Sequence, residues 1–386
     1  MQMTAGKTAA QQILLLCMTN GITPRSSERL LRLTNGPVDW HYVVEMAAFH
    51  GITPLVARNL ADNGVSSRVP QPCLDELRKA SRSTLYRNII LSAELAGVLS
   101  AFAGYGISAI CLKGVALADS LYGNIGLRQT GDMDILLHPA DIPAARALLQ
   151  QRGYREGTPG KGPLHPFHGE PFWKQDGIDL MIELHWSPEN RRLVDIPEEQ
   201  IWRRARPLDF QGVSTLVLSP EDNFLFLSNH LFKHDTMRLK LLTDIAVLLE
   251  KHGETLDWDY IHLTARDWHI EPTVYYALML VRELADTPIP DAVPRAMRPR
   301  AWRRWLVGYL ADERDLTAPV ENARLREWTA SIVRSLLMKN PREMLYVLSR
   351  QEGTEKPLKW LRAIFWTAVV FIARLGRFRI WHAAGK

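Results

Sequence analysis

The chain has 386 residues, enough for two or three domains built around a large hydrophobic core. Hydrophobic residues make up 46% of it and charged residues 23%, a balance typical of globular proteins that excludes wholesale disorder. The formal net charge of +5 is small for this length and is weak support for a nucleic-acid partner. Basic residues gather locally instead, at 295–304 and at 356–386.

The three cysteines, Cys17, Cys73 and Cys111, form no C-x-x-C pair, which argues against a disulfide framework and a zinc site. The N-terminus lacks an apolar run long enough for a secretion signal. We therefore expect a cytoplasmic protein.

Residues 1–81 show apolar positions at helical spacing and predict a helical N-terminal region. The sequence Gly-Ile-Thr-Pro interrupts this pattern at 21–24 and again at 51–54. A four-residue sequence used twice is more consistent with a reused helix-ending turn than with a structural repeat.

Between residues 82 and 218 the hydrophobic period switches between that of a helix and that of a strand. The expected elements are a helix at 84–103, a strand at 108–112, a short helix opened by Lys113-Gly114, a strand at 132–137 and a helix ending at Gly153. Two hairpins follow, turned at Asp176-Gly177 and at Gln211-Gly212. This region is expected to be a small mixed sheet flanked by helices.

Residues 219–386 read as helical, beginning with the capping sequence Ser219-Pro220-Glu221-Asp222. Further helices are expected at 237–251, 270–286, 300–312, 320–338, 341–350 and 357–380. The apolar run at 363–373 is too short to span a bilayer, so no transmembrane segment is predicted. Its basic, tryptophan-containing flanks suit either a buried C-terminal helix or peripheral contact with a membrane. The predicted fold class is α+β.

Two acidic side chains, Asp132 and Asp134, share one face of the strand predicted at 132–137, because side chains alternate along a strand. Such a pair repels itself unless a proton or a cation bridges it, and oxygen ligands favour Mg²⁺ or Mn²⁺. By itself, an Asp-x-Asp sequence is more often a solvated strand end. On the strand ending in Glu183-Leu184-His185, Glu183 supplies a third carboxylate if the two strands lie side by side. Three carboxylates on adjacent strands can hold two metal ions for phosphoryl chemistry.

The stretch LKGVALADSLYGNIGLRQTGDMDILL, followed by IELHW and LSPEDNFLFLSNHLFKHDTMRLKLLTDIAVLL, resembles a family of uncharacterised bacterial nucleotidyltransferases. More broadly it is similar to nucleotidyltransferases of the DNA polymerase beta type. The resemblance covers about residues 85–285 and implies that Asp132, Asp134 and Glu183 are catalytic metal ligands.

The resemblance also implies that the Lys113-Gly114 turn contacts the nucleotide, where backbone N–H groups favour a phosphate. The superfamily usually has Gly-Ser or Gly-Gly where this chain has Gly114-Val115. A phosphate-binding hydroxyl is therefore missing, and Lys113 or Arg128 are candidates to replace it.

Four other residues are candidates for nucleotide binding. Arg128 lies in a glycine-rich loop and can neutralise a triphosphate or pair with a carboxylate, and His185 can contact substrate, orient a ligand or be structural. His230 lies near one end of a helix, and Asp244 falls on the apolar stripe of the next helix, where a buried acid needs a partner. For Asp244, a structural ion pair and a site role both remain open.

The sequence thus predicts a metal-dependent enzyme that transfers a nucleoside monophosphate from an NTP, with ATP favoured, to an unidentified small molecule, peptide or RNA. One alternative is a nucleotide-binding regulator or scaffold without turnover, which the missing serine favours and the three acids oppose. Another is an RNA-modifying nucleotidyltransferase that uses the arginines at 295–304 to hold its substrate.

Overall fold

The computed structural model describes residues 5–157, 169–189, 194, 196–232, 238–285 and 287–304. By its internal contacts the chain divides into two compact units, one of residues 1–226 and 246–256, the other of residues 227–245 and 257–386. The domain boundaries predicted after residues 81 and 218 remain predictions.

The first unit begins with the predicted helical region, which contains α1 (Ala5–Cys17), α2 (Pro24–Leu33), α3 (Trp40–His50) and α4 (Thr53–Asp62). The Gly-Ile-Thr-Pro sequences lie between helices. At the first, Thr23 accepts a hydrogen bond from the N–H of Ser26 and Pro24 begins α2. At the second, Gly51 ends α3 in the left-handed conformation, with φ of 70°, and Pro54 lies in the first turn of α4. Both copies therefore begin a helix, but only the second copy also ends one, because α1 already ends at Cys17.

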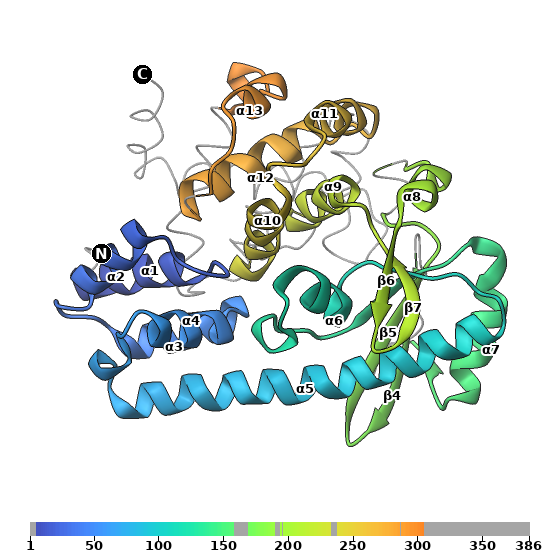
Figure 1. Ribbon diagram of the computed structural model, residues 1–386, viewed down its shortest axis with the longest axis horizontal. Coiled ribbons are helices and arrows are strands. Elements are labelled where there is room, and N and C mark those ends of the chain that lie inside the picture. Colours follow the sequence, from blue (N-terminus) through green and yellow to red (C-terminus); the bar gives the residue numbers. More distant parts are fainter. Residues whose placement is uncertain are drawn as a thin grey trace, which may run out of the picture. The chain divides into compact units, whose positions relative to one another are not determined.

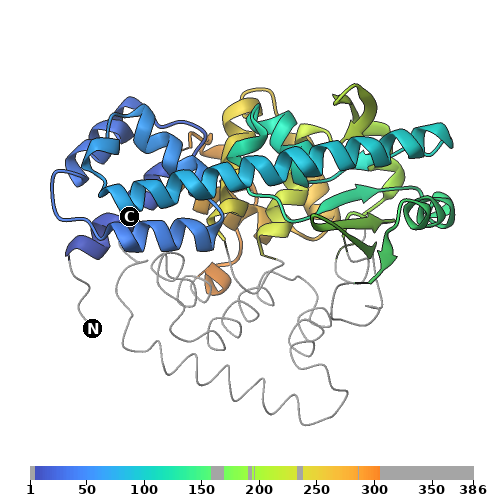
Figure 2. The same cartoon turned by 90° about the horizontal axis from the view of Figure 1, so that it is seen from below.

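Helix α5 (Gln71–Gly104) is much longer than the helix expected at 84–103. It runs from α3 and α4 to the sheet, as both views show (Figures 1 and 2). By length and composition, α5 alone among the described helices could cross a membrane. Its apolar side chains Leu91, Leu95, Val98 and Phe102 are nevertheless buried in the core of the first unit, the behaviour of a core helix.

A seven-stranded mixed sheet forms the centre of the first unit, with the order β3-β4-β5-β2-β1-β7-β6. Its strands are β1 (Ile110–Cys111), β2 (Met133–Leu136), β3 (Arg155–Glu156), β4 (Gly169–Asp176), β5 (Ile178–His185), β6 (Arg206–Phe210) and β7 (Val213–Val217). β2 pairs with β5 and β1 with β7 in parallel, and the other pairs are antiparallel. The predicted α+β class with a small mixed sheet is confirmed.

Strand alternation separates an apolar face of the sheet from a polar one. Met133 and Ile135 of β2, with Ile182 and Leu184 of β5, are buried in one hydrophobic cluster with α5. Helix α7 (Ile142–Gln151) joins the same cluster through Ala145, Leu148 and Leu149. Asp134 and Glu183 occupy the alternate positions, so they project from the opposite face.

Both predicted hairpins are present. β4 and β5 pair along their whole length around Gly177, which has a φ of +69°. β6 and β7 turn at Gln211 and Gly212, whose φ values are both positive, as a tight two-residue hairpin turn requires. The short strand β3, α8 (Glu198–Arg204) and α11 (Trp258–Asp267) were not predicted.

Helix α9 (Pro220–Leu231) begins in the first unit and ends in the second, and α10 (Leu239–His252) begins in the second and ends in the first. The second unit also contains α11, α12 (Glu271–Leu284) and α13 (Ala292–Ala296). Helix α12, predicted at 270–286, buries Val274, Ala277, Leu278 and Val281. The helices predicted at 320–338, 341–350 and 357–380, and most of that at 300–312, lie outside the described residues.

Candidate metal and nucleotide site

The centre of the candidate site is a pair of carboxylates on neighbouring parallel strands. Asp134 of β2 lies directly beside Glu183 of β5 in the strand register. Neighbouring strands are about 4.8 Å apart, so the two side chains share one small volume. The strand pairing on which a third carboxylate depended is thereby confirmed.

Two cationic side chains meet these carboxylates. The Lys113 Nζ lies 3.0 Å from Oδ1 of Asp134. The His185 Nε2 lies 3.2 Å from the same Oδ1 and 3.4 Å from Oε2 of Glu183. Asp134 and His185 are almost fully buried, whereas Glu183 is partly exposed.

The contacts fix which groups carry charge. Burial by itself raises the pKa of Asp134, but the charge of Lys113 and the hydrogen bond to His185 outweigh it and leave this pKa well below its ordinary value. Burial lowers the pKa of Lys113 and of His185, and in both cases the neighbouring carboxylates more than compensate, so both values are raised. The hydrogen bond from His185 lowers the pKa of Glu183. Opposite charges are therefore held together in a site of low polarity.

One buried oxygen in this cluster has no hydrogen-bond partner among the described residues, namely Oδ2 of Asp134. Leaving a buried carboxylate oxygen unsatisfied is costly, and a bound cation would satisfy it. Single ligand atoms from Asp134, Glu183 and His185 all lie within 4.8 Å of one another. These three residues, called the metal group below, therefore fit a divalent metal ion.

Asp132 occupies a different position from the one expected. It directly precedes β2, is partly exposed, and does not belong to the metal group found in the described part of the chain. Its charge helps to raise the pKa of Lys113. Asp132 is thus electrostatically coupled to the cluster, and its role as a metal ligand remains a prediction.

The Lys113-Gly114 turn brings β1 close to the start of β2. Gly114 has a φ of +72°, a region that favours glycine. A Cβ atom at this position would also lie 2.8 Å from the carbonyl oxygen of Asp132. Helix α6 (Gly114–Leu117) is only one turn long before it widens into the π-helical segment Ala118–Tyr122. Its dipole is small, so phosphate binding here would depend on local N–H groups and on Lys113.

Arg128 is buried and donates a hydrogen bond of 3.4 Å to the carbonyl oxygen of Gly114. It thereby links the glycine loop, residues 123–131, to the Lys113-Gly114 turn. Contact between Arg128 and a phosphate remains a prediction.

Two neighbouring residues of α5, which the sequence did not indicate, hold the glycine loop. Arg87 donates to the carbonyl oxygens of Thr130 at 3.2 Å, Gly131 at 3.1 Å and Asp179 at 3.0 Å. The buried Asn88 donates to the carbonyl oxygens of Ile125 and Arg128. These long-range contacts connect the residues before Asp132 to the start of β5. No local sequence pattern predicts them.

Gly169 is another residue that the sequence did not single out. It lies opposite His185 in the register of β4 and β5. A Cβ atom at Gly169 would be 2.8 Å from Nδ1 of His185. The missing side chain therefore makes room for the imidazole.

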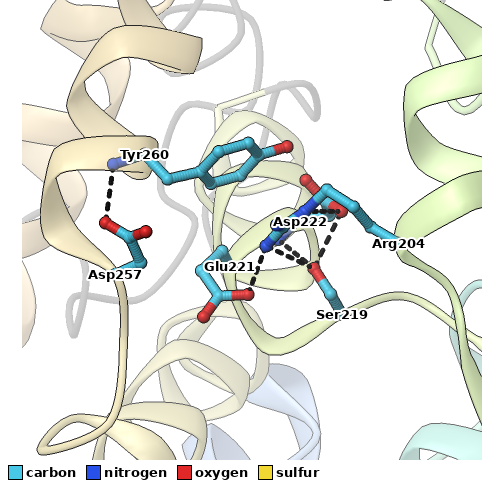
Figure 3. A network of polar contacts seen from close by, with 6 residues as sticks. All are labelled: Arg204, Ser219, Glu221, Asp222, Asp257 and Tyr260. Atoms are coloured by element: carbon cyan, nitrogen blue, oxygen red, sulfur yellow. Dashed lines mark hydrogen bonds and ion pairs between the residues drawn. The ribbon is translucent and has the colours of Figure 1, made fainter.

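The capping sequence at the start of α9 forms a buried ionic network (Figure 3). Ser219 Oγ accepts from the N–H of Asp222 and donates to its carboxylate, at 3.2 Å and 2.8 Å. Arg204 of α8 donates to Glu221 at 2.7 Å and to Asp222 at 3.2 Å. Figure 3 also shows the α11 cap, where Asp257 accepts from the N–H of Tyr260. These contacts are structural and fix helix starts.

Two predicted site residues, His230 and Asp244, belong to the second unit and are buried there. They are not among the residues of the metal group found in the described part of the chain, and their nucleotide-binding role remains a prediction. The loop histidines His165 and His168 lie outside the described residues.

The family model described as "Uncharacterised nucleotidyltransferase" matches residues 36–286. A comparison with curated proteins found no match. Among solved structures, an antigenic nucleotidyltransferase-like protein from Paracoccidioides brasiliensis matches with 14% identity and a TM-score of 0.35. That match covers 53% of this chain and 95% of the other. A TM-score of this size is too low to establish a common fold.

Proposed function

Because the chain belongs to the family of uncharacterised nucleotidyltransferases, we propose that it transfers a nucleoside monophosphate from an NTP to an acceptor with the help of a divalent metal. The observation that carries this proposal is the register pair Asp134 and Glu183, with His185 Nε2 facing both carboxylates. An uncompensated oxygen of Asp134 in this cluster supports metal binding. Bacterial origin and membership of the DNA polymerase beta-type superfamily remain predictions.

The proposed reaction is an in-line displacement at the α-phosphorus. An oxygen or nitrogen of the acceptor forms the new bond to phosphorus and loses its proton to solvent. The bond between the α-phosphorus and its bridging oxygen breaks, and pyrophosphate leaves with that electron pair. Asp134 and Glu183, with Asp132 as a further carboxylate, would hold a divalent metal, which would supply positive charge to stabilise the phosphoryl oxygens and the acceptor anion. A second ion, as the sequence predicts, would act in the same way.

The chain's own residues orient the substrate. Lys113 supplies a fixed positive charge next to the carboxylates. The Lys113-Gly114 turn and Arg128 would bind the triphosphate through N–H donors and charge, in place of the serine hydroxyl that Val115 lacks. The face that carries Asp134 is opposite the hydrophobic cluster, so the chemistry takes place away from the core. We propose ATP as the nucleotide and the cytoplasm as the location.

A transfer assay tests this proposal. The protein is incubated with α-³²P-labelled NTP, Mg²⁺ or Mn²⁺, and pools of small molecules, peptides and RNA. We expect acceptor-dependent release of pyrophosphate together with incorporation of the label, both lost in Asp134→Asn. Label transfer that survives unchanged in Asp134→Asn would place the chemistry elsewhere. Tight NTP binding without any turnover would favour the regulator or scaffold alternative.

RNA as the acceptor is favoured by a separate feature of the second unit. Arg298 and Arg300 are exposed, have no carboxylate partner among the described residues, and lie close in sequence to the exposed Trp302. Arginines that bind phosphates beside an aromatic side chain that stacks on a base form a common surface for single-stranded nucleic acid. RNA binding whose affinity falls steeply as salt is added would support this acceptor. The salt dependence should be smaller in the double variant Arg298→Gln/Arg300→Gln. RNA binding that does not depend on salt would exclude RNA as the acceptor.

A further inference from the structure

We infer that His185 is a direct ligand of the metal, and that the metal group therefore selects Mn²⁺ over Mg²⁺. This inference rests on the proposed function for its metal dependence and adds the identity of the ligands and of the ion. The resemblance described above implies three carboxylates as ligands. The geometry instead places an imidazole nitrogen among two carboxylates, with Asp132 outside the group.

Nε2 of His185 is close to both carboxylates of the metal group. This nitrogen lies 3.2 Å from Asp134 Oδ1 and 3.4 Å from Glu183 Oε2, so it faces both carboxylates at once. A metal ion attracted by the same carboxylates would meet the same nitrogen, which can bind it after losing its proton.

The backbone of β4 fixes the orientation of the ring. The position of a Cβ atom at Gly169 would be 2.8 Å from Nδ1 of His185 and 2.8 Å from the carbonyl oxygen of Leu184. The Nδ1 edge of the imidazole therefore lies against β4, and Nε2 is the nitrogen left to face the carboxylates. His185 is also only 4% exposed, which limits its freedom to turn away from the metal group.

The two oxygens of Asp134 have different surroundings. Oδ1 contacts both Lys113 and His185, whereas Oδ2 is buried without a partner among the described residues. A metal ion that binds Oδ2, Glu183 and His185 would satisfy this oxygen and leave the Lys113 contact in place. The alternative is that His185 only orients the carboxylates by hydrogen bonds, with all metal ligands being oxygens.

Ligand chemistry distinguishes the two arrangements. Mg²⁺ strongly prefers oxygen ligands in an octahedral arrangement and keeps much of its water. Imidazole favours transition metals, and Mn²⁺ also accepts carboxylates, so a mixed set of one nitrogen and two carboxylates favours Mn²⁺. A purely oxygen site would show a smaller preference.

Electron paramagnetic resonance of Mn²⁺ bound to the full-length, metal-free protein tests the inference without nucleotide or turnover. Electron spin echo modulation detects a nitrogen bound directly to Mn²⁺. We expect ¹⁴N modulation in the wild type and its replacement by ¹⁵N frequencies when histidine is labelled with ¹⁵N. In His185→Gln we expect the nitrogen signal to be lost and the Mn²⁺ affinity to fall about 10-fold or more. The Mg²⁺ affinity should change much less.

His138→Gln is the matched control, because His138 is a partly buried histidine just beyond β2 that stacks on Trp202 instead of joining the metal group. It should keep the wild-type spectrum. Bound Mn²⁺ without nitrogen modulation, or modulation that persists in His185→Gln, overturns the inference but leaves the proposed function standing. If no divalent ion binds at all, both fail. The labelled wild type decides the question if His185→Gln does not fold.

Discussion

Asp134 is a buried acid whose neighbours at contact distance are cations. Lys113 and His185 both reach its Oδ1, and the contacts keep the pKa of Asp134 well below that of a free carboxyl. A buried ion pair gives little net stability over apolar residues, but removing one partner leaves an uncompensated charge. The pair therefore constrains the site more than it stabilises the fold, and its energetic role can be measured by removing each charge.

We predict that Asp134→Asn lowers the free energy of unfolding by on the order of 3 kcal/mol, because it leaves Lys113 without its closest anion. Lys113→Met in the same chain should recover part of this loss. Urea unfolding of the two single variants and the double variant, with EDTA present, measures the coupling. Additive effects of the two substitutions would show that the Lys113 and Asp134 side chains do not interact in solution.

Gly114→Ala is predicted to destabilise the protein for two reasons, the positive φ of 72° and the 2.8 Å approach to the Asp132 carbonyl. Gly123→Ala is the matched control, since Gly123 has a φ of +66° but nothing within 4 Å of an added Cβ. The shared backbone strain costs about 1 kcal/mol, and the clash should add roughly 1–3 kcal/mol at Gly114 only. Equal losses in thermal or urea unfolding would mean that the close approach relaxes freely.

Part of the candidate site could be predicted from the sequence for a simple physical reason. Alternation along a strand places Asp134 on one face and Glu183 and His185 on one face of the next strand, whatever the rest of the fold does. The sequence could not show whether Asp132 or His185 joins Asp134 and Glu183 in the metal group. The answer depends on where β2 begins and on the orientation of the imidazole ring that Gly169 permits. Both are consequences of strand pairing across the sheet.

At the scale of elements, α5 connects the core to the site. Its leucines pack in the hydrophobic cluster, while Arg87 and Asn88 hold the backbone of the glycine loop just before Asp132. A loop whose carbonyl oxygens accept hydrogen bonds from a helix side chain is held more firmly in one conformation. The position of Asp132 therefore depends on a helix far from it in sequence.

We predict that Arg87→Lys lowers the free energy of unfolding by about 1–2 kcal/mol, since a lysine cannot reach three carbonyl oxygens with a planar fork. Hydrogen exchange should become faster across the glycine loop. Arg82→Lys serves as the control, because Arg82 is an exposed residue of the same helix. Equal exchange in the two variants would contradict a holding role for Arg87.

The elements that the sequence predicted well are those with local signals. Gly177 and Gly212 allow the positive φ that the turns of the β4–β5 and β6–β7 hairpins require. Ser219 caps the start of α9 by accepting a hydrogen bond from a backbone N–H three residues later. The part of α5 before residue 84 was missed because its polar residues weaken the apolar period there. β3 was missed because two residues carry no period, and its pairing with β4 is a tertiary contact.

At the scale of the whole molecule, all three cysteines are buried thiols. Burial raises the pKa of Cys17 and of Cys111 to about 12, so both stay protonated in the folded chain at neutral pH. A thiol whose pKa is higher in the folded state contributes stability that is complete below the unfolded value of 9.0. This contribution is lost as the pH rises from there towards 12.

We predict that a thiol reagent such as DTNB reacts with none of the three cysteines in the native protein at pH 8, and with all three after denaturation. The stability advantage of the wild type over Cys17→Ala should shrink between pH 9 and pH 11. Rapid labelling of the native protein, or a difference that grows with pH, would show that these thiols are accessible.

The family match at residues 36–286 includes parts of both compact units. The family pattern therefore extends beyond the sheet to α12, and it includes α9, which contains His230, and α10, which contains Asp244. The predicted nucleotide-binding role of His230 and Asp244 requires that the protein binds a nucleotide. Nucleotide binding is therefore the property to measure first.

The proposed nucleotide site is best tested by calorimetric binding of each NTP to the full-length protein, with EDTA, with Mg²⁺ and with Mn²⁺. We predict metal-dependent binding that is lost in Asp134→Asn and in Glu183→Gln and is retained in His138→Gln, all three variants being checked for folding by circular dichroism. Binding that needs no metal, or equal binding by the wild type and Asp134→Asn, would contradict a nucleotide site built on these two carboxylates.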